Sequence, residues 1–175
     1  HWWPEVQEAI IGSAFVLAAT ASVLLLAGDP HGAEQIKELL GGQILWVSWS
    51  QLVQVAIVYA AVLALWFMPW WRSNNLRFYF LFAIAVTASV QMVGVYLVFA
   101  SLIIPALAVR RLSRTQGLAV GYLVGVLGYA GGLVLSLFSD LPAGALVVWM
   151  IALTSVAAAL VLRGRAHADA TTGQT

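Results

Sequence analysis

One uncharged stretch decides the fold of this chain: FYFLFAIAVTASVQMVGVYLVFASLIIPALAV, residues Phe78–Val109. It is 32 residues long and is flanked by Arg77 and Arg110. A helix needs about 20 apolar residues to cross a bilayer, and arginine gathers on the cytoplasmic side of membranes. If both flanking arginines are cytoplasmic, the stretch must cross the membrane twice.

We therefore predict a tight helical hairpin that runs out along Phe78–Val93 and back along Val95–Val109, around Gly94. Helices of about 16 residues are at the lower limit for spanning and need burial against neighbours. The alternative is one long tilted helix, which would place Arg77 and Arg110 on opposite sides of the membrane.

The composition of the whole chain also indicates a membrane protein. Of its 175 residues, 62% are hydrophobic and 9% are charged, and the mean hydropathy is +0.94. A soluble domain carries about 25% charged residues and cannot hide so much apolar surface from water. This argues against a soluble enzyme, a nucleic-acid binder and a disordered chain. The lack of cysteine excludes disulfides, thiolate metal sites and cysteine nucleophiles.

Four further uncharged stretches predict four more crossings. They are Ala9–Gly28, Ser48–Trp70, Thr115–Ser139 and Leu141–Leu162. With this topology the arginine clusters are all cytoplasmic, and the acidic residues Asp29, Glu34, Glu38 and Asp140 are external. The clusters are Arg72/Arg77, Arg110/Arg111/Arg114 and Arg163/Arg165.

The predicted fold is an all-α polytopic membrane helix bundle of about six transmembrane helices. It covers residues 1–163, and residues 164–175 form a short polar tail that we expect to be disordered. Both termini are expected on the cytoplasmic side of the plasma (inner) membrane.

The residues offer no catalytic chemistry, so the chain is not predicted to be an enzyme. There is no HExxH, no GxSxG elbow and no phosphate-binding loop. The spans carry no charged side chain, which argues against a proton pump. Gln91 is bulky and polar, and it is hard to place away from a bundle interior or a watery path. We take Gln91 and Asp140 as candidate residues of a transport path.

Small residues form a second pattern, which predicts close helix packing in the fourth uncharged stretch. Glycines recur there at spacings of about one helical turn, which lets helix backbones approach one another. They are Gly117, Gly121, Gly125, Gly128, Gly131 and Gly132.

Three segments together resemble the zinc/manganese-type ABC transporter permeases. Upstream, EAIIGSAFVLAATASVLLL and PHGAEQIKELLGGQILWVS are similar to that family's preceding helix and outer loop. SVQMVGVYLVFASLIIPALAVRRL (Ser89–Leu112) is similar to that family's central motif: a glycine, an apolar run, a proline with small residues, and a cytoplasmic basic turn. LSLFSDLPAGALVV (Leu135–Val148) is similar to its acidic-Leu-Pro-x-Gly element. The order and spacing agree from Glu8 to about Leu162. Family members are longer, so the resemblance implies a carboxy-terminal portion without the family's first helices; a fragment, a divergent subgroup or a degenerate copy would each look like this.

The resemblance implies the permease subunit of an ATP-driven importer for a divalent transition metal, zinc or manganese. Its fold would be that of the metal- and cobalamin-type importers. The turn formed by Arg110, Arg111, Leu112, Ser113 and Arg114 would then dock into a separate ATP-hydrolysing subunit. The same arginines have a simpler explanation as signals that set the membrane topology.

The other expected partners are an external metal-binding protein, a second permease copy and the lipid bilayer, but no nucleic acid. The chain itself would carry no cofactor, since ATP binds the partner subunit and the metal is the cargo. The sequence leaves the residues that contact the metal unassigned. Two alternatives remain open: a degenerate, non-transporting membrane scaffold, and the permease of a cobalamin- or siderophore-type importer.

Overall fold

The computed structural model describes residues 4–27, 48–68, 75–110, 112–139 and 141–172. The backbone over these ranges is helical and contains no strand. The described helices are α1 (Pro4–Leu26), α3 (Trp49–Phe67), α4 (Asn75–Val93), α5 (Val95–Val109), α6 (Arg114–Phe138) and α7 (Ala143–Thr172). Five of these described helices are long and apolar enough to cross a membrane, and α5 is a shorter apolar helix of 15 residues. The prediction of an all-α polytopic membrane bundle is confirmed.

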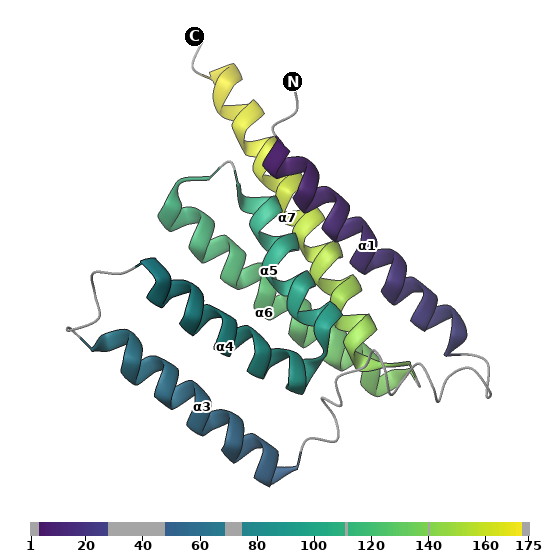
Figure 1. Ribbon diagram of the computed structural model, residues 1–175. Helices are drawn as coiled ribbons and strands as arrows, with labels where there is room; N and C mark the ends of the chain where they lie inside the picture. Colours follow the sequence, from purple (N-terminus) through teal and green to yellow (C-terminus); the bar gives the residue numbers. More distant parts are fainter. Residues whose placement is uncertain (1–3, 28–47, 69–74, 111, 140, 173–175) are drawn as a thin grey trace.

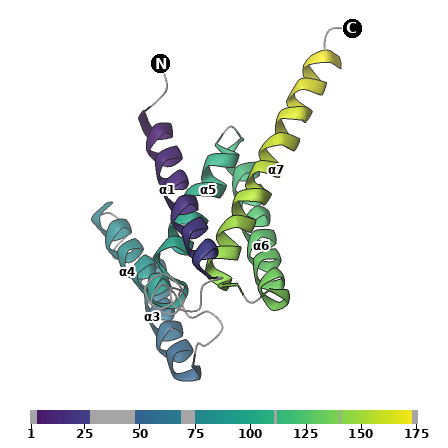
Figure 2. The same ribbon diagram turned by 90° about the vertical axis from the view of Figure 1, so that its right-hand side faces the viewer.

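The predicted hairpin is present as α4 and α5, which are separated by Gly94 alone. Gly94 has φ 87° and ψ 155°, a backbone conformation that is essentially restricted to glycine. Figure 1 and Figure 2 show α5 running back toward the end of the molecule at which α4 begins. Arg77 and Arg110 therefore lie at the same end of the bundle, which excludes the single tilted helix.

The helix boundaries differ from the uncharged stretches at the two ends of the chain. α1 begins at Pro4 rather than Ala9, because a helix continues beyond the membrane surface and proline suits a first turn. α7 runs on to Thr172, so the backbone of residues 164–172 is helical where we predicted a disordered tail. The alanines of this segment favour helix, and nothing in it stops α7 at Arg163.

Helices α1, α5, α6 and α7 form the part of the molecule that we call the body. Its buried core lies on α1, α5 and α7 and consists of Val16, Leu97, Ala100, Ile104, Val147, Val148 and Ile151. Helix α6 packs against α7 so closely that a Cβ atom on Gly128 would lie 2.8 Å from the Cα of Ile151. A Cβ on Gly132 would lie 2.8 Å from the backbone nitrogen of Val147. The predicted role of these two glycines in helix packing is confirmed.

Helices α3 and α4 form a second part, which we call the arm. Both views show them to one side of the body (Figure 1 and Figure 2). Helix α3 contains no buried residue, and its main contacts are with α4. Its N-terminus is closed by a capping box, in which Ser48 and Gln51 each hydrogen-bond the other's backbone N–H. The arm therefore reaches the body chiefly through α4 and its junction with α5.

Candidate functional site

The predicted docking segment is a short turn between α5 and α6. The chain stays helical at Arg110, and the N–H of Leu112 donates to the carbonyl of Val109 over 2.9 Å. Ser113 is extended, with φ −60° and ψ 156°, and starts α6. The N–H of Gly117 donates to the Ser113 carbonyl over 2.7 Å. The turn is thus closed by backbone hydrogen bonds at both ends.

The side chains of this turn divide into exposed polar groups and one apolar contact. Arg110, Ser113 and Arg114 are exposed, and no hydrogen bond or ion pair joins either arginine to another described residue. Leu112 is half-buried, and a Cβ on the buried Gly117 would lie 3.8 Å from the Leu112 Cβ. Arg111 lies outside the described residues. The turn presents guanidinium groups that no other described residue neutralises, beside a leucine that is anchored on the start of α6.

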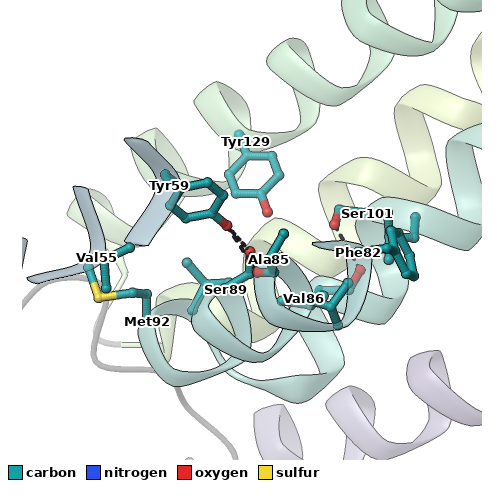
Figure 3. Close-up of a pocket in the computed structure, with 12 residues that line it drawn as sticks. Val55, Tyr59, Phe82, Ala85, Val86, Ser89, Met92, Ser101 and Tyr129 are labelled. Atoms are coloured by element: carbon teal, nitrogen blue, oxygen red, sulfur yellow. Dashed lines mark hydrogen bonds between the residues drawn. The ribbon is translucent and has the colours of Figure 1, made fainter. Parts of the chain in front are cut away.

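A crevice of about 460 Å³ lies between the arm and the body. Figure 3 shows it with side chains from α3, α4, α5 and α6 around it. Most of the lining is apolar. The lining residues are Val55, Tyr59, Phe82, Ala85, Val86, Ser89, Met92, Val93, Val98, Ser101, Leu102 and Tyr129.

Four hydroxyl groups lie in this crevice, and most of them are bonded within the protein. Tyr59 of α3 hydrogen-bonds the Ser89 hydroxyl of α4 and donates to the Ala85 carbonyl over 3.2 Å. Ser89 donates to the same carbonyl over 2.9 Å, and Ser101 of α5 donates to the Val98 carbonyl over 2.8 Å. Tyr129 of α6 points its hydroxyl toward the same space (Figure 3).

The crevice has no charged group and no strong metal ligand among its lining residues. Across the described parts of the chain, no three His, Asp or Glu side chains come together in one group. Sequence reasoning missed Tyr59 and Tyr129. Their position was the available signal, because tyrosine prefers the membrane surface and these two lie well inside spans.

The described part of the structure does not test whether the two candidate path residues lie together, because it includes only Gln91. Gln91 is exposed on α4 and does not line the crevice. Asp140 lies outside the described residues, just before α7 begins. The path assignment of both residues stays a prediction.

Models of known protein families test the resemblance seen in the sequence. The model of the ABC 3 transport family matches residues 71–162, which is just over half of the chain. This range holds the hairpin, the basic turn and the α6–α7 pair. The chain belongs to the ABC 3 transport family. The resemblance to zinc/manganese-type ABC permeases is confirmed, and the chain is a multi-pass membrane protein of a transport family.

A curated relative of this chain is the high-affinity zinc uptake system membrane protein ZnuB of Haemophilus influenzae. The two are 30% identical over 131 residues, which is 62% of this chain and 50% of the relative. The chain therefore spans about half the length of the curated relative that it matches. No solved structure matches the chain.

Proposed function

We propose that this chain belongs to the membrane-spanning permease subunit of an ATP-driven importer for a divalent transition metal, zinc or manganese. The observation that carries the proposal is the family match, which covers the hairpin and the basic turn together. The relative's name as a zinc uptake protein supports a metal cargo over cobalamin or a siderophore.

The exposed turn from Arg110 to Arg114 is the proposed docking site for a cytoplasmic ATP-hydrolysing subunit. Exposed guanidinium groups that bond no other described residue suit carboxylates on another protein, because arginine pairs with them in a bidentate way. Leu112 supplies one apolar contact, and its position against Gly117 holds it at the base of the turn. The positive-inside rule places this end of the bundle in the cytoplasm.

The proposed mechanism is alternating access driven by the partner. ATP binding closes two ATPase subunits, and the turn transmits that movement to the helices that flank it. Helix α5 carries the movement to α4, and α6 carries it to α7, against which it packs through Gly128 and Gly132. Close backbone packing favours movement of α6 and α7 together, because neither helix can slide far without a clash.

The cargo path is proposed to lie between two permease copies, with Gln91 and Asp140 near it. Gln91 is exposed on a single chain, and no hydrogen bond joins its amide to another described residue. An unpaired amide is costly in hydrocarbon, so a facing helix or water would stabilise it. The external metal-binding protein would deliver its ion to the acidic surface of Asp29, Glu34, Glu38 and Asp140, all outside the described residues.

The test is metal uptake in cells that lack their own importer. The protein is produced with an ATP-binding subunit and a metal-binding protein of the same transporter family. We expect the intact protein to restore growth under zinc or manganese starvation, and Arg110/Arg111/Arg114→Ala to abolish it.

Two controls separate docking from topology. The Lys version of the triple substitution keeps the positive charges that orient the protein, and labelling from each side of the membrane checks the orientation of both variants. Leu112→Ala is compared with Leu118→Ala, a substitution of a leucine that is 67% exposed on α6. Growth of the Ala triple variant equal to the intact protein contradicts docking, and no uptake by any form favours the scaffold alternative.

A further inference from the structure

The arm and the body are joined mainly through α4. Helix α3 packs mainly on α4, and α4 packs mainly on α3 and α5. The core cluster of the body includes no buried residue from the arm, although Val93 at the end of α4 packs against it. Leu81 and Ala88 of α4 are buried outside that cluster. Among the described residues, the main line of attachment of the arm to the body thus runs along α4.

That line ends at Gly94. The Gly94 N–H donates to the Val90 carbonyl over 2.9 Å, and the Val98 N–H donates to the Gly94 carbonyl over 3.2 Å. Both helices therefore keep their hydrogen bonds up to this one residue, which alone absorbs the reversal of the chain. A single glycine with positive φ between two intact helices has the form of a hinge.

Inside the arm, polar contacts join α3 to α4 at two positions along their length. At one end, Arg77 of α4 donates through Nη2 to the carbonyl of Leu65 over 2.5 Å and to the carbonyl of Trp66. Its guanidinium carbon lies 5.8 Å from the centre of the Trp66 ring. Arg77 thereby caps the C-terminus of α3, where the last carbonyls lack partners within their own helix.

The second tie is in the middle of the arm, where Tyr59 hydrogen-bonds Ser89 and the Ala85 carbonyl. Trp66 and Phe78 add an edge-to-face ring contact, with centroids 6.3 Å apart, next to Arg77. These contacts all join α3 to α4 and none joins α3 to the body. They favour an arm that keeps its own shape while it moves.

The crevice provides the room for such a movement. Its volume of about 460 Å³ separates Tyr59 and Ser89 of the arm from Ser101 and Tyr129 of the body. The side chains on both sides are apolar or carry a hydroxyl group, so closing the crevice would bring apolar surfaces together without burying an unpaired charge (Figure 3).

We propose that α3 and α4 move as one rigid arm about Gly94, opening and closing the crevice, and that Arg77 is the positioning residue that locks α3 to α4. The proposal goes beyond metal transport and does not depend on it, because the movement belongs to the chain itself.

The test measures distances between pairs of spin labels on the protein in lipid nanodiscs. The chain has no cysteine, so each pair is introduced without removing native residues. Ile57 with Phe80 reports on the arm, Leu123 with Leu160 on the body, and Ile57 with Leu123 on the distance between arm and body. All four side chains are exposed. Dilution with unlabelled protein leaves only distances within one chain.

We expect the distance distribution between arm and body to be about twice as broad as that within the arm or within the body. Arg77→Gln should broaden the distribution within the arm and leave the one within the body unchanged. Gly94→Ala should shift or narrow the distribution between arm and body, because alanine does not adopt the positive φ of this residue.

If the three label pairs give distance distributions of equal width in the protein without Arg77→Gln or Gly94→Ala, the proposal of a hinged arm is wrong. An unchanged distribution within the arm of Arg77→Gln overturns the role of Arg77. Both outcomes are readable even if Gly94→Ala does not fold. Neither requires transport, so a failure of the metal-import proposal and a failure of the hinge are told apart.

Discussion

Two pairs of consecutive helices in this molecule are held together by different means. In the body, α6 packs on α7 at the backbone, through Gly128 and Gly132. In the arm, α3 is tied to α4 by the side chains of Tyr59 and Arg77, and no residue of α3 is buried. The first pair has close steric complementarity, while the second has specific polar ties across a looser contact.

The way in which each helix pair is held together matters because the lipid around a membrane protein is apolar. Lipid tails solvate leucine and valine as well as another helix does, so burial of apolar surface alone does not hold membrane helices together. Close approach of backbones adds dispersion contacts, and hydrogen bonds add direction. The body should therefore respond most to changes of volume, and the arm to loss of polar atoms.

The largest effect is expected for Gly132→Ala. The added Cβ would lie 2.8 Å from the backbone nitrogen of Val147, and a backbone atom cannot rotate away as a side-chain tip can. The two helices must move apart, and we expect the free energy of unfolding to fall by about 3 kcal/mol. Unfolding by denaturant in detergent micelles measures this change.

The matched control for this substitution is Gly125→Ala on the same helix. A Cβ at Gly125 meets nothing within 4 Å, and alanine has the better helix propensity. We expect stability to be unchanged or slightly raised. Equal losses at both glycines would show that the α6–α7 contact is looser than described.

A smaller effect is expected for Tyr59→Phe in the arm. The substitution removes the hydrogen bonds to Ser89 and to the Ala85 carbonyl and keeps the ring. We expect a loss of about 1–1.7 kcal/mol, the upper range for polar contacts between membrane helices. Unfolding of Tyr59→Phe, Ser89→Ala and the double variant gives the coupling between the two hydroxyls.

Tyr122→Phe serves as the control, because Tyr122 is 79% exposed on α6 and no hydrogen bond joins its hydroxyl to another described residue. Its substitution should leave stability unchanged. If the two Tyr→Phe variants behave alike, or if the Tyr59–Ser89 coupling is zero, the polar tie of the arm is not a stabilising contact.

The smallest effect is expected for Thr154→Val, which removes a polar contact within the body. The Thr154 hydroxyl lies 3.3 Å from the Val124 carbonyl of α6, but it also lies 2.8 Å from the Met150 carbonyl of its own helix. We expect a loss of about 0.6 kcal/mol or less. Thr20→Val is the reference, since Thr20 bonds only carbonyls of α1. A loss as large as that of Tyr59→Phe would remove the contrast between arm and body.

The sequence was most informative where arginines flank an uncharged stretch whose length can be compared with the thickness of a bilayer. Arg77 and Arg110 at the ends of an uncharged stretch, with Gly94 near its middle, predicted the hairpin. The structure places the reversal at that glycine. The same reasoning placed Arg110 and Arg114 between two spans at one end of the bundle, and the structure describes both as exposed there. The glycine pattern predicted close packing, yet it did not distinguish Gly132 from Gly125, which differ completely in what surrounds them.

The sequence was least informative about the arm. Arg77 was interpreted as a topology signal, whereas the structure shows it capping α3. The crevice was not predicted, because Tyr59, Ser89, Ser101 and Tyr129 lie on four different helices and no spacing along the chain links them.

The amino-acid sequence by itself determined which stretches are able to span a membrane and where the chain reverses, because a charged group in hydrocarbon is costly wherever the other helices lie. Only the tertiary structure decided which faces meet, which glycines allow backbone contact and which hydroxyls share the crevice. The reason is that faces toward lipid and faces toward a neighbouring helix are equally apolar, so the residues alone do not tell one from the other.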